Sequence, residues 1–149
     1  GEKGTVVMFI CNHCPFVKHV NDEIVRLAND YRVLGFGFVA ISSNDVENYP
    51  EDHPKLMHEN ARKHNFTFPY LYDETQEVAK AYGAVCTPDF FGYNKDLGLQ
   101  YRGRLDESRK ESVANAKRDL FEAMKEVAAT GKGPTEQIPS MGCSIKWLD

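Results

Sequence analysis

The chain lacks the features that mark membrane proteins, nucleic-acid-binding proteins and disulfide-stapled mini-proteins. Its 149 residues contain no apolar run near the roughly 20 residues that span a bilayer, and the first residues lack the pattern of a signal peptide. The net charge is −4, with lysines and arginines scattered among acids, which argues against a nucleic-acid surface. Four cysteines are too few and too uneven for a small disulfide framework. We therefore expect no membrane and no nucleic-acid partner.

What is present suits a compact domain. The chain is 42% hydrophobic and 27% charged, which is enough to bury a proper core. We expect one domain over residues 1–132 and an irregular tail over 133–149 that packs on it, in a cytoplasmic protein. Only four residues precede the first apolar run. We expect the natural protein to begin further upstream, where a targeting segment would change that location.

Two cysteines stand between a β-rich run and an amphipathic stretch. Cys11 and Cys14 directly follow the apolar run 6–10, and apolar residues then recur at helical spacing. A helix start offers unpaired N–H groups and the positive end of the helix dipole, which lower the pKa of the first thiol. The second thiol lies one helical turn away, within reach of a mixed disulfide on the first. The spacing predicts a reversible dithiol–disulfide couple that needs no cofactor.

The rest of the chain alternates between strand and helix patterns. The expected strands cover residues 5–10, 36–43, 68–73, 89–93 and 99–104. The expected helices cover residues 17–34, a part of 50–65, 74–82 and 107–130. We expect the first two strands to be parallel and the last two to form an antiparallel hairpin. This order predicts an α/β fold, with a central mixed sheet of about five strands and helices on both faces.

Four stretches together resemble the thioredoxin-fold superfamily, in its redoxin branch of peroxiredoxin-like and thioredoxin-like thiol-disulfide oxidoreductases. They are the strand with Cys-Asn-His-Cys-Pro at 11–15, Phe-Pro-Tyr-Leu-Tyr-Asp at 68–73, Cys-Thr-Pro-Asp-Phe-Phe at 86–91 and the hairpin at 93–104. The resemblance implies a thioredoxin-like fold and a cis peptide bond between Thr87 and Pro88 that faces the dithiol. Backbone groups of Cys86 and Thr87 would then pair with a bound substrate chain.

The motif and the resemblance together predict roles for the site residues. Cys11 is expected to be the exposed nucleophile and Cys14 the resolving thiol of a thiol-disulfide oxidoreductase. His13 would favour the thiolate and tilt the couple toward oxidation. The substrate is expected to contact Asn12, Pro15, Phe16, Cys86, Thr87 and Pro88. The partners implied are protein or small-molecule thiols and disulfides, together with an unidentified reducing or oxidising partner.

The chain departs from the family pattern in three places. Thr5 and Ile10 stand where thioredoxins proper carry a buried Asp and a Trp. Pro15 directly follows the motif, where it removes an N–H that the first helical turn leaves unpaired anyway. Redoxin domains also usually begin with an extra strand or hairpin, which four residues cannot supply. Either the chain is a trimmed fragment, or another subunit of a homodimer covers that sheet edge.

A thiol-dependent peroxidase of the peroxiredoxin type is one alternative. Peroxide would oxidise Cys11 to a sulfenic acid, which Cys14 or Cys143 would resolve. Peroxiredoxins proper carry a Thr three residues before the peroxidatic cysteine, and Met8 stands at that position here, which weakens this hypothesis.

A non-catalytic or zinc-held binding scaffold is the other alternative. Cys11 and Cys14 would form half of a structural zinc site, completed by His13, His19 or Cys143. Zinc sites of this class commonly use a second closely spaced ligand pair, which the sequence does not show.

The other cysteines and the remaining histidines have simpler interpretations. Cys86 is expected to fill space beside the proline loop. Cys143 is expected to be incidental in a tail that Ile145 and Trp147 dock on the surface. The histidines at 53, 58 and 64 do not fall on one helical face and are expected to be solvated.

Overall fold

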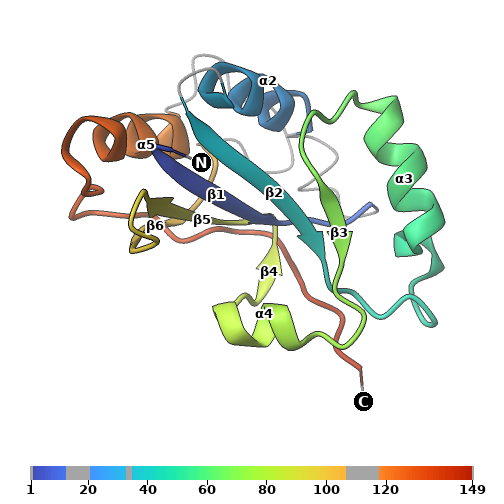
Figure 1. Cartoon of the computed structure of the whole chain (residues 1–149). Helices are drawn as coiled ribbons and strands as arrows, with labels where there is room; N and C mark the ends of the chain where they lie inside the picture. The colour runs from blue at the N-terminus through green and yellow to red at the C-terminus, as the bar shows by residue number, and fades with distance from the viewer. Residues whose placement is uncertain (1, 13–20, 33–34, 107–117, 149) are drawn as a thin grey trace.

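A five-stranded mixed sheet forms the centre of the molecule, seen in a computed structural model that describes residues 2–12, 21–32, 35–106 and 118–148 (Figure 1). Its strands, in spatial order, are β3 (Tyr70–Tyr72), β2 (Phe36–Ser42), β1 (Gly4–Phe9), β5 (Asp89–Asn94) and β6 (Leu99–Gly103). β1, β2 and β3 run parallel, whereas β5 is antiparallel to both β1 and β6. The expected mixed sheet, its parallel first pair and the C-terminal hairpin are confirmed.

In the part of the chain that the structure describes, four α-helices and a 3-10 helix accompany the sheet. They are α2 (Asn21–Arg32), η1 (Pro50–Asp52), α3 (Pro54–Lys63), α4 (Glu77–Tyr82) and α5 (Asp119–Thr130). The two helices expected at 17–34 and 107–130 are therefore seen as α2 and α5, and residues 17–20, 33–34 and 107–117 lie outside the described part of the chain. Among the described residues, no helix is long and apolar enough to cross a membrane.

Side chains of β1 alternate between two cores, which places helices on both faces of the sheet. Val6, Met8 and Ile10 pack with apolar residues of α2 and α5. Val7 and Phe9 face the other way and pack with residues of α4 and of the C-terminal tail. Figure 1 shows α2 and α5 together on one side of the sheet and α4 on the other. Helices on both faces are thus confirmed.

Close packing between α5 and the sheet depends on a glycine in β5. A Cβ atom built at Gly92 would lie 2.5 Å from Met124 Sδ, closer than real Cβ contacts. Met124 is fully buried. A side chain at position 92 would therefore force the Met124 side chain to shift within the core.

The C-terminal tail returns along β6 to the opposite end of the molecule (Figure 1). It leaves α5 at Gly131, whose φ of 78° is the left-handed conformation typical of a helix end. The Ile138 carbonyl then accepts a hydrogen bond from the Arg104 N–H at 3.0 Å, and the Ser140 hydroxyl donates to the Gly103 carbonyl at 2.6 Å. Beyond these contacts, β7 (Cys143–Ser144) pairs with β4 (Cys86–Thr87) in a separate two-stranded sheet.

Candidate functional site

Cys11 lies just past the end of β1, against the loop that contains Pro88. The Ile10 N–H donates to the Ile41 carbonyl at 3.0 Å, so β2 still holds the chain one residue before the cysteine. Cys11 Sγ lies 3.4 Å from the Thr87 hydroxyl oxygen, and either group can be the donor. The peptide bond between Thr87 and Pro88 is cis, which confirms the sequence prediction. The fold thus brings together two predicted site residues that are far apart in the sequence.

Cys11 is buried, so the sequence prediction of an exposed nucleophile is wrong for this conformation. Its exposed fraction is 1%, and that of Thr87 is 2%. The hydroxyl of Thr87 lies on the sulfur, and Cys143 of the tail packs against the same core cluster as Cys11. The sequence placed Cys11 at a helix start but could not show these long-range contacts.

Asp52, from the 3-10 helix η1, forms a polar connection beside the cysteine. Its carboxylate is fully buried and accepts a hydrogen bond from the Asn12 backbone N–H at 2.8 Å. The other carboxylate oxygen accepts from the Asn44 side-chain amide at 2.9 Å. The Asn44 amide oxygen in turn accepts from the Lys146 backbone N–H at 2.9 Å. A continuous hydrogen-bonded chain therefore joins the cysteine motif to the C-terminal tail.

Asn12 is held from two further directions. Its side-chain amide donates to the Glu51 carbonyl at 3.0 Å, and the Tyr70 hydroxyl donates to its amide oxygen at 3.0 Å. Burial raises the pKa of Tyr70 well above its usual value, and the nearby Cys11 and Asp52 raise it further. Tyr70 therefore remains a neutral hydrogen-bond donor at physiological pH. Asn12, predicted to contact substrate, is in this structure also a junction of the site's framework.

Sequence reasoning missed Asp52, Asn44 and Tyr70 as parts of the site. In the sequence, Asp52 has a local explanation as an acid near the start of the helix expected within 50–65, and Asn44 directly follows the strand expected at 36–43. One signal in the sequence could have indicated this part of the site: Asn12 and Asn44 each follow one of two neighbouring parallel strands. Polar residues at such positions meet at one edge of a sheet. The buried carboxylate that thioredoxins proper place at the position of Thr5 has no counterpart there, yet a buried carboxylate reaches this site from η1.

Several predicted site residues cannot be placed. His13, Cys14, Pro15 and Phe16 lie outside the described residues, so their roles remain predictions. The same holds for the zinc ligand set, which includes His13, Cys14 and His19. Within residues 2–12, 21–32, 35–106 and 118–148, no three His, Cys, Asp or Glu side chains gather as a metal site.

Cys86 lies next to Thr87 but faces elsewhere. Its Sγ lies 3.8 Å from the Pro88 carbonyl oxygen and 4.0 Å from the Ser140 carbonyl oxygen. It lines a small cavity of about 270 Å³, together with Val85, Asp89, Arg102, Pro139 and Ser140. Burial raises the pKa of Asp89, and Arg102 partly offsets that effect. Cys86 and Cys11 thus occupy different surroundings.

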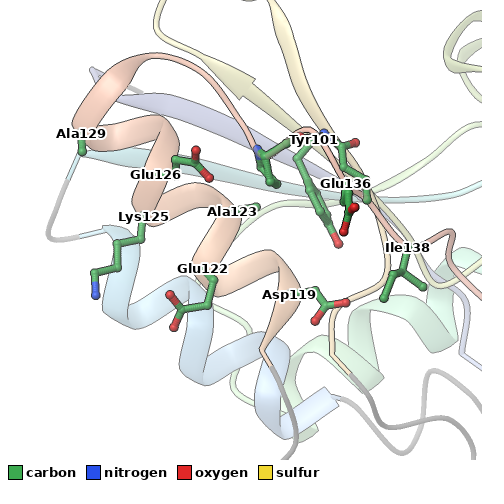
Figure 2. Close-up of a pocket in the computed structure, with 11 residues that line it drawn as sticks. Tyr101, Asp119, Glu122, Ala123, Lys125, Glu126, Ala129, Glu136 and Ile138 are labelled. Carbon is green, nitrogen blue, oxygen red and sulfur yellow. Dashed lines mark hydrogen bonds between the residues drawn. The ribbon is translucent and has the colours of Figure 1, made fainter.

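A larger cavity of about 490 Å³ lies between α5, β6 and the tail (Figure 2). Figure 2 shows Asp119, Glu122 and Glu126 of α5 on one side and Tyr101 and Ile138 on the other. Of the predicted site residues that the structure describes, none lines this cavity. It is therefore separate from the surroundings of Cys11.

Comparison with known proteins agrees with this geometry. The model of the AhpC/TSA family matches residues 1–107, which include β1, the cysteine motif and the proline loop. The chain belongs to the AhpC/TSA family. It is a thioredoxin-fold protein of the redoxin branch, as the sequence resemblance implied. α5 and the tail lie beyond the matched residues.

Solved structures show the same fold along the whole chain. An uncharacterized conserved protein from Geobacillus kaustophilus is 53% identical, with a TM-score of 0.91 over 99% of this chain and 78% of that one. A hypothetical protein from Sinorhizobium meliloti is 38% identical, with a TM-score of 0.92 over 99% of this chain and 81% of that one. A secreted disulfide oxidoreductase of Mycobacterium tuberculosis, 21% identical over 66% of this chain and 67% of that one, shares the fold with a TM-score of 0.56. No curated protein matches the sequence.

Proposed function

We propose that this AhpC/TSA-family protein is a thiol-disulfide oxidoreductase, with Cys11 as the nucleophile and Cys14 as the resolving thiol. The observation that carries the proposal is the contact of 3.4 Å between Cys11 Sγ and the Thr87 hydroxyl, at the end of β1 in a redoxin fold. A hydroxyl that can donate to the sulfur stabilises the thiolate, which is the reactive form. The secreted disulfide oxidoreductase of Mycobacterium tuberculosis shares this fold, which supports the same reaction class.

The proposed reaction consists of two exchanges. The Cys11 thiolate attacks one sulfur of a substrate disulfide, so a Cys11–substrate bond forms, and the other substrate sulfur leaves as a thiolate and takes up a proton. The Cys14 thiolate then attacks Cys11 Sγ, which forms the Cys11–Cys14 disulfide and releases the second substrate thiol. The substrate gains the two electrons that the dithiol loses. An external dithiol or disulfide partner returns the pair to its starting state, in either direction of flow.

Trapping of the intermediate tests these roles. In a Cys143→Ser background, a Cys14→Ser variant retains the attacking thiol but lacks a resolving one, so it should accumulate mixed disulfides with a model protein disulfide such as insulin. A Cys11→Ser variant should accumulate none at that site, and it should also lose dithiothreitol-dependent insulin reduction. Non-reducing electrophoresis and peptide mapping identify the sulfur involved. Equal accumulation in both variants would contradict the assignment.

Peroxide reduction is a second candidate activity, because the matched family is AhpC/TSA. Cys11 would attack a peroxide oxygen, release water or an alcohol, and become a sulfenic acid that a second thiol condenses to a disulfide. Met8, which occupies the position of the peroxiredoxin Thr, counts against this activity. Stopped-flow oxidation of Cys11 by hydrogen peroxide decides the matter. A rate no higher than that of a free cysteine would eliminate it.

A further inference from the structure

The C-terminal tail occupies the strand edge that was expected to receive substrate. β7 is antiparallel to β4, with Ser144 opposite Cys86 and Cys143 opposite Thr87. An extended peptide that binds by strand addition makes the same kind of pairing. The segment that lies where a substrate chain would add is therefore a part of this molecule, and it carries a thiol.

The register directs Cys143 toward Cys11. Residues directly opposite in an antiparallel pair project their side chains to the same face, and the hydroxyl of Thr87 projects onto Cys11 Sγ at 3.4 Å. In agreement, Cys143 packs against the core cluster that contains Cys11. Cys86, one residue earlier in β4, faces the small cavity near Ser140 instead. Because side chains alternate along a strand, the thiols of Cys86 and Cys143 lie on opposite faces of this two-stranded sheet.

The tail is fixed in this register on both sides of Cys143. A Cβ atom at Gly142 would lie 2.0 Å from the Thr87 carbonyl oxygen, so the backbone can approach this closely only with a glycine there. On the other side, Ile145 is 3% exposed, and its N–H donates to the Val85 carbonyl at 3.0 Å. These contacts hold Cys143 in a defined place opposite Thr87. Its position is set by the residues around it.

The carbonyl of Lys146 is a further anchor of the tail. It accepts hydrogen bonds from the Asp45 N–H at 2.8 Å and from the Gln76 side-chain amide at 2.9 Å. The Gln76 amide oxygen accepts from the Leu148 N–H at 2.8 Å. Gln76 is 1% exposed, so these bonds are shielded from water.

We propose that Cys143 is a third redox-active thiol, which exchanges disulfides directly with Cys11. This proposal rests on the proposed function, because it requires that Cys11 first forms a mixed disulfide. The Cys143 thiolate attacks Cys11 Sγ, so the Cys11–Cys143 bond forms and the bond from Cys11 to the substrate breaks. The substrate sulfur leaves as a thiolate and takes up a proton. Cys11 and Cys143 together lose the two electrons that the substrate disulfide gains, so Cys14 is not required for this turnover.

The test uses 5,5′-dithiobis(2-nitrobenzoate), which releases one coloured thiolate when it joins a cysteine and a second when that mixed disulfide is resolved. In a Cys14→Ser/Cys86→Ser protein, the remaining thiols are Cys11 and Cys143. One equivalent of the reagent should release two coloured thiolates. The second release should be first-order and independent of protein concentration, and peptide mapping should find the Cys11–Cys143 disulfide.

Two matched variants of that protein locate the effect. Adding Cys143→Ser should leave one release and a stable mixed disulfide on Cys11. Adding Cys143→Ser together with Ser144→Cys moves the thiol by one residue, to the face that lies away from Cys11. The second release should then slow by about tenfold or more, because intramolecular reactions depend on the alignment of the reacting atoms. Thermal unfolding of each protein verifies that it is folded.

The possible results separate the two proposals. If the mixed disulfide on Cys11 persists equally with and without Cys143, the third-thiol proposal is wrong and the proposed function stands. If the native protein forms no mixed disulfide on Cys11 while the unfolded protein does, both proposals are wrong. A second release of equal rate from the shifted thiol at position 144 would also overturn the assignment, because the register would then not matter.

Discussion

Replacement of Asp52 by Asn should weaken the connection between the cysteine motif and the tail, although it changes almost no volume. Asp52 accepts hydrogen bonds on both carboxylate oxygens, from the Asn12 N–H and the Asn44 side chain. An amide offers one acceptor and one donor at these positions. If the new amide keeps its oxygen toward Asn12, its NH₂ group faces that of Asn44. Rotation of the Asn44 amide only moves the conflict, since its NH₂ group would then face the Lys146 N–H.

The magnitude follows from one buried conflict between donors. An unsatisfied buried donor costs about 1–3 kcal/mol, and the replacement of a charged acceptor by a neutral one costs about 1 kcal/mol more. We expect the free energy of unfolding to fall by about 3 kcal/mol, which for a chain of this size lowers Tm by roughly 6–12 °C. Because Asp52 is 0% exposed, water cannot supply the missing acceptor without structural change.

Chemical denaturation and hydrogen exchange measure this effect. The Asp52→Asn protein should lose stability, and the Lys146 amide hydrogen should exchange faster. The matched control is the double variant Asp52→Asn/Asn44→Asp, in which the carboxylate introduced at position 44 accepts from both the Lys146 N–H and the new amide at position 52. That exchange of the two side chains should restore most of the lost stability and the protection of Lys146.

Two results would refute the reasoning. One is an Asp52→Asn protein within about 0.5 kcal/mol of the parent, the range of ordinary surface substitutions. The other is a double variant whose loss of unfolding free energy equals the sum of the losses in its two single variants. Residues that are coupled should depart from such additivity.

Three further predictions concern the packing and titration of the fold. Ile145 is 3% exposed, so Ile145→Ala should leave a cavity and lower the free energy of unfolding by about 2–4 kcal/mol, as measured by urea denaturation. The amide hydrogens of the tail should also exchange faster. A loss below about 1 kcal/mol would mean that the tail is not docked as described. Tyr70→Phe removes the hydroxyl that donates to Asn12 and should cost about 1 kcal/mol by the same assay; a stabilising effect would contradict the bond. Burial raises the pKa of Tyr31 from 10.0 to about 12, and the nearby Glu122 adds to this effect. Between these two pH values the unfolded state binds fewer protons than the folded state, so the free energy of unfolding falls as the pH rises, by up to about 1.4 kcal/mol per pH unit. A Tyr31→Phe protein should lose stability less steeply over that interval, and an equal slope would show that Tyr31 does not titrate as stated.

Local patterns were sufficient to predict the framework of the fold. The β-rich apolar run at 5–10 predicted the strand that is seen as β1, and the turn between β5 and β6 follows from its polar residues and glycine. Thr87 and Pro88 could be assigned to a cis bond facing the dithiol because a family resemblance covers that loop. These features depend on short segments or on a motif with a known context.

The surroundings of Cys11 could not be read from local patterns. Asp52 follows a proline at the start of a short helix, where an acid already has a local explanation, and its partner Asn12 lies 40 residues away. β7 comprises two residues, too few to show periodicity, and its position depends on contacts with β4 and with Gln76. Cys11 itself meets Thr87, which lies 76 residues away in the sequence. Prediction therefore failed where the site is built by tertiary packing.

The central claim is that Cys11 and Cys14 form a reversible two-electron couple, and a redox titration tests it most directly. The protein is equilibrated in glutathione buffers of graded potential, the thiols are alkylated, and the disulfide is located by peptide mapping, in a Cys86→Ser/Cys143→Ser background that removes the other thiols. We predict one two-electron transition assigned to Cys11–Cys14, with a midpoint above the value of about −270 mV for thioredoxin because of His13. The absence of a Cys11–Cys14 disulfide at every potential in the folded protein would contradict the account.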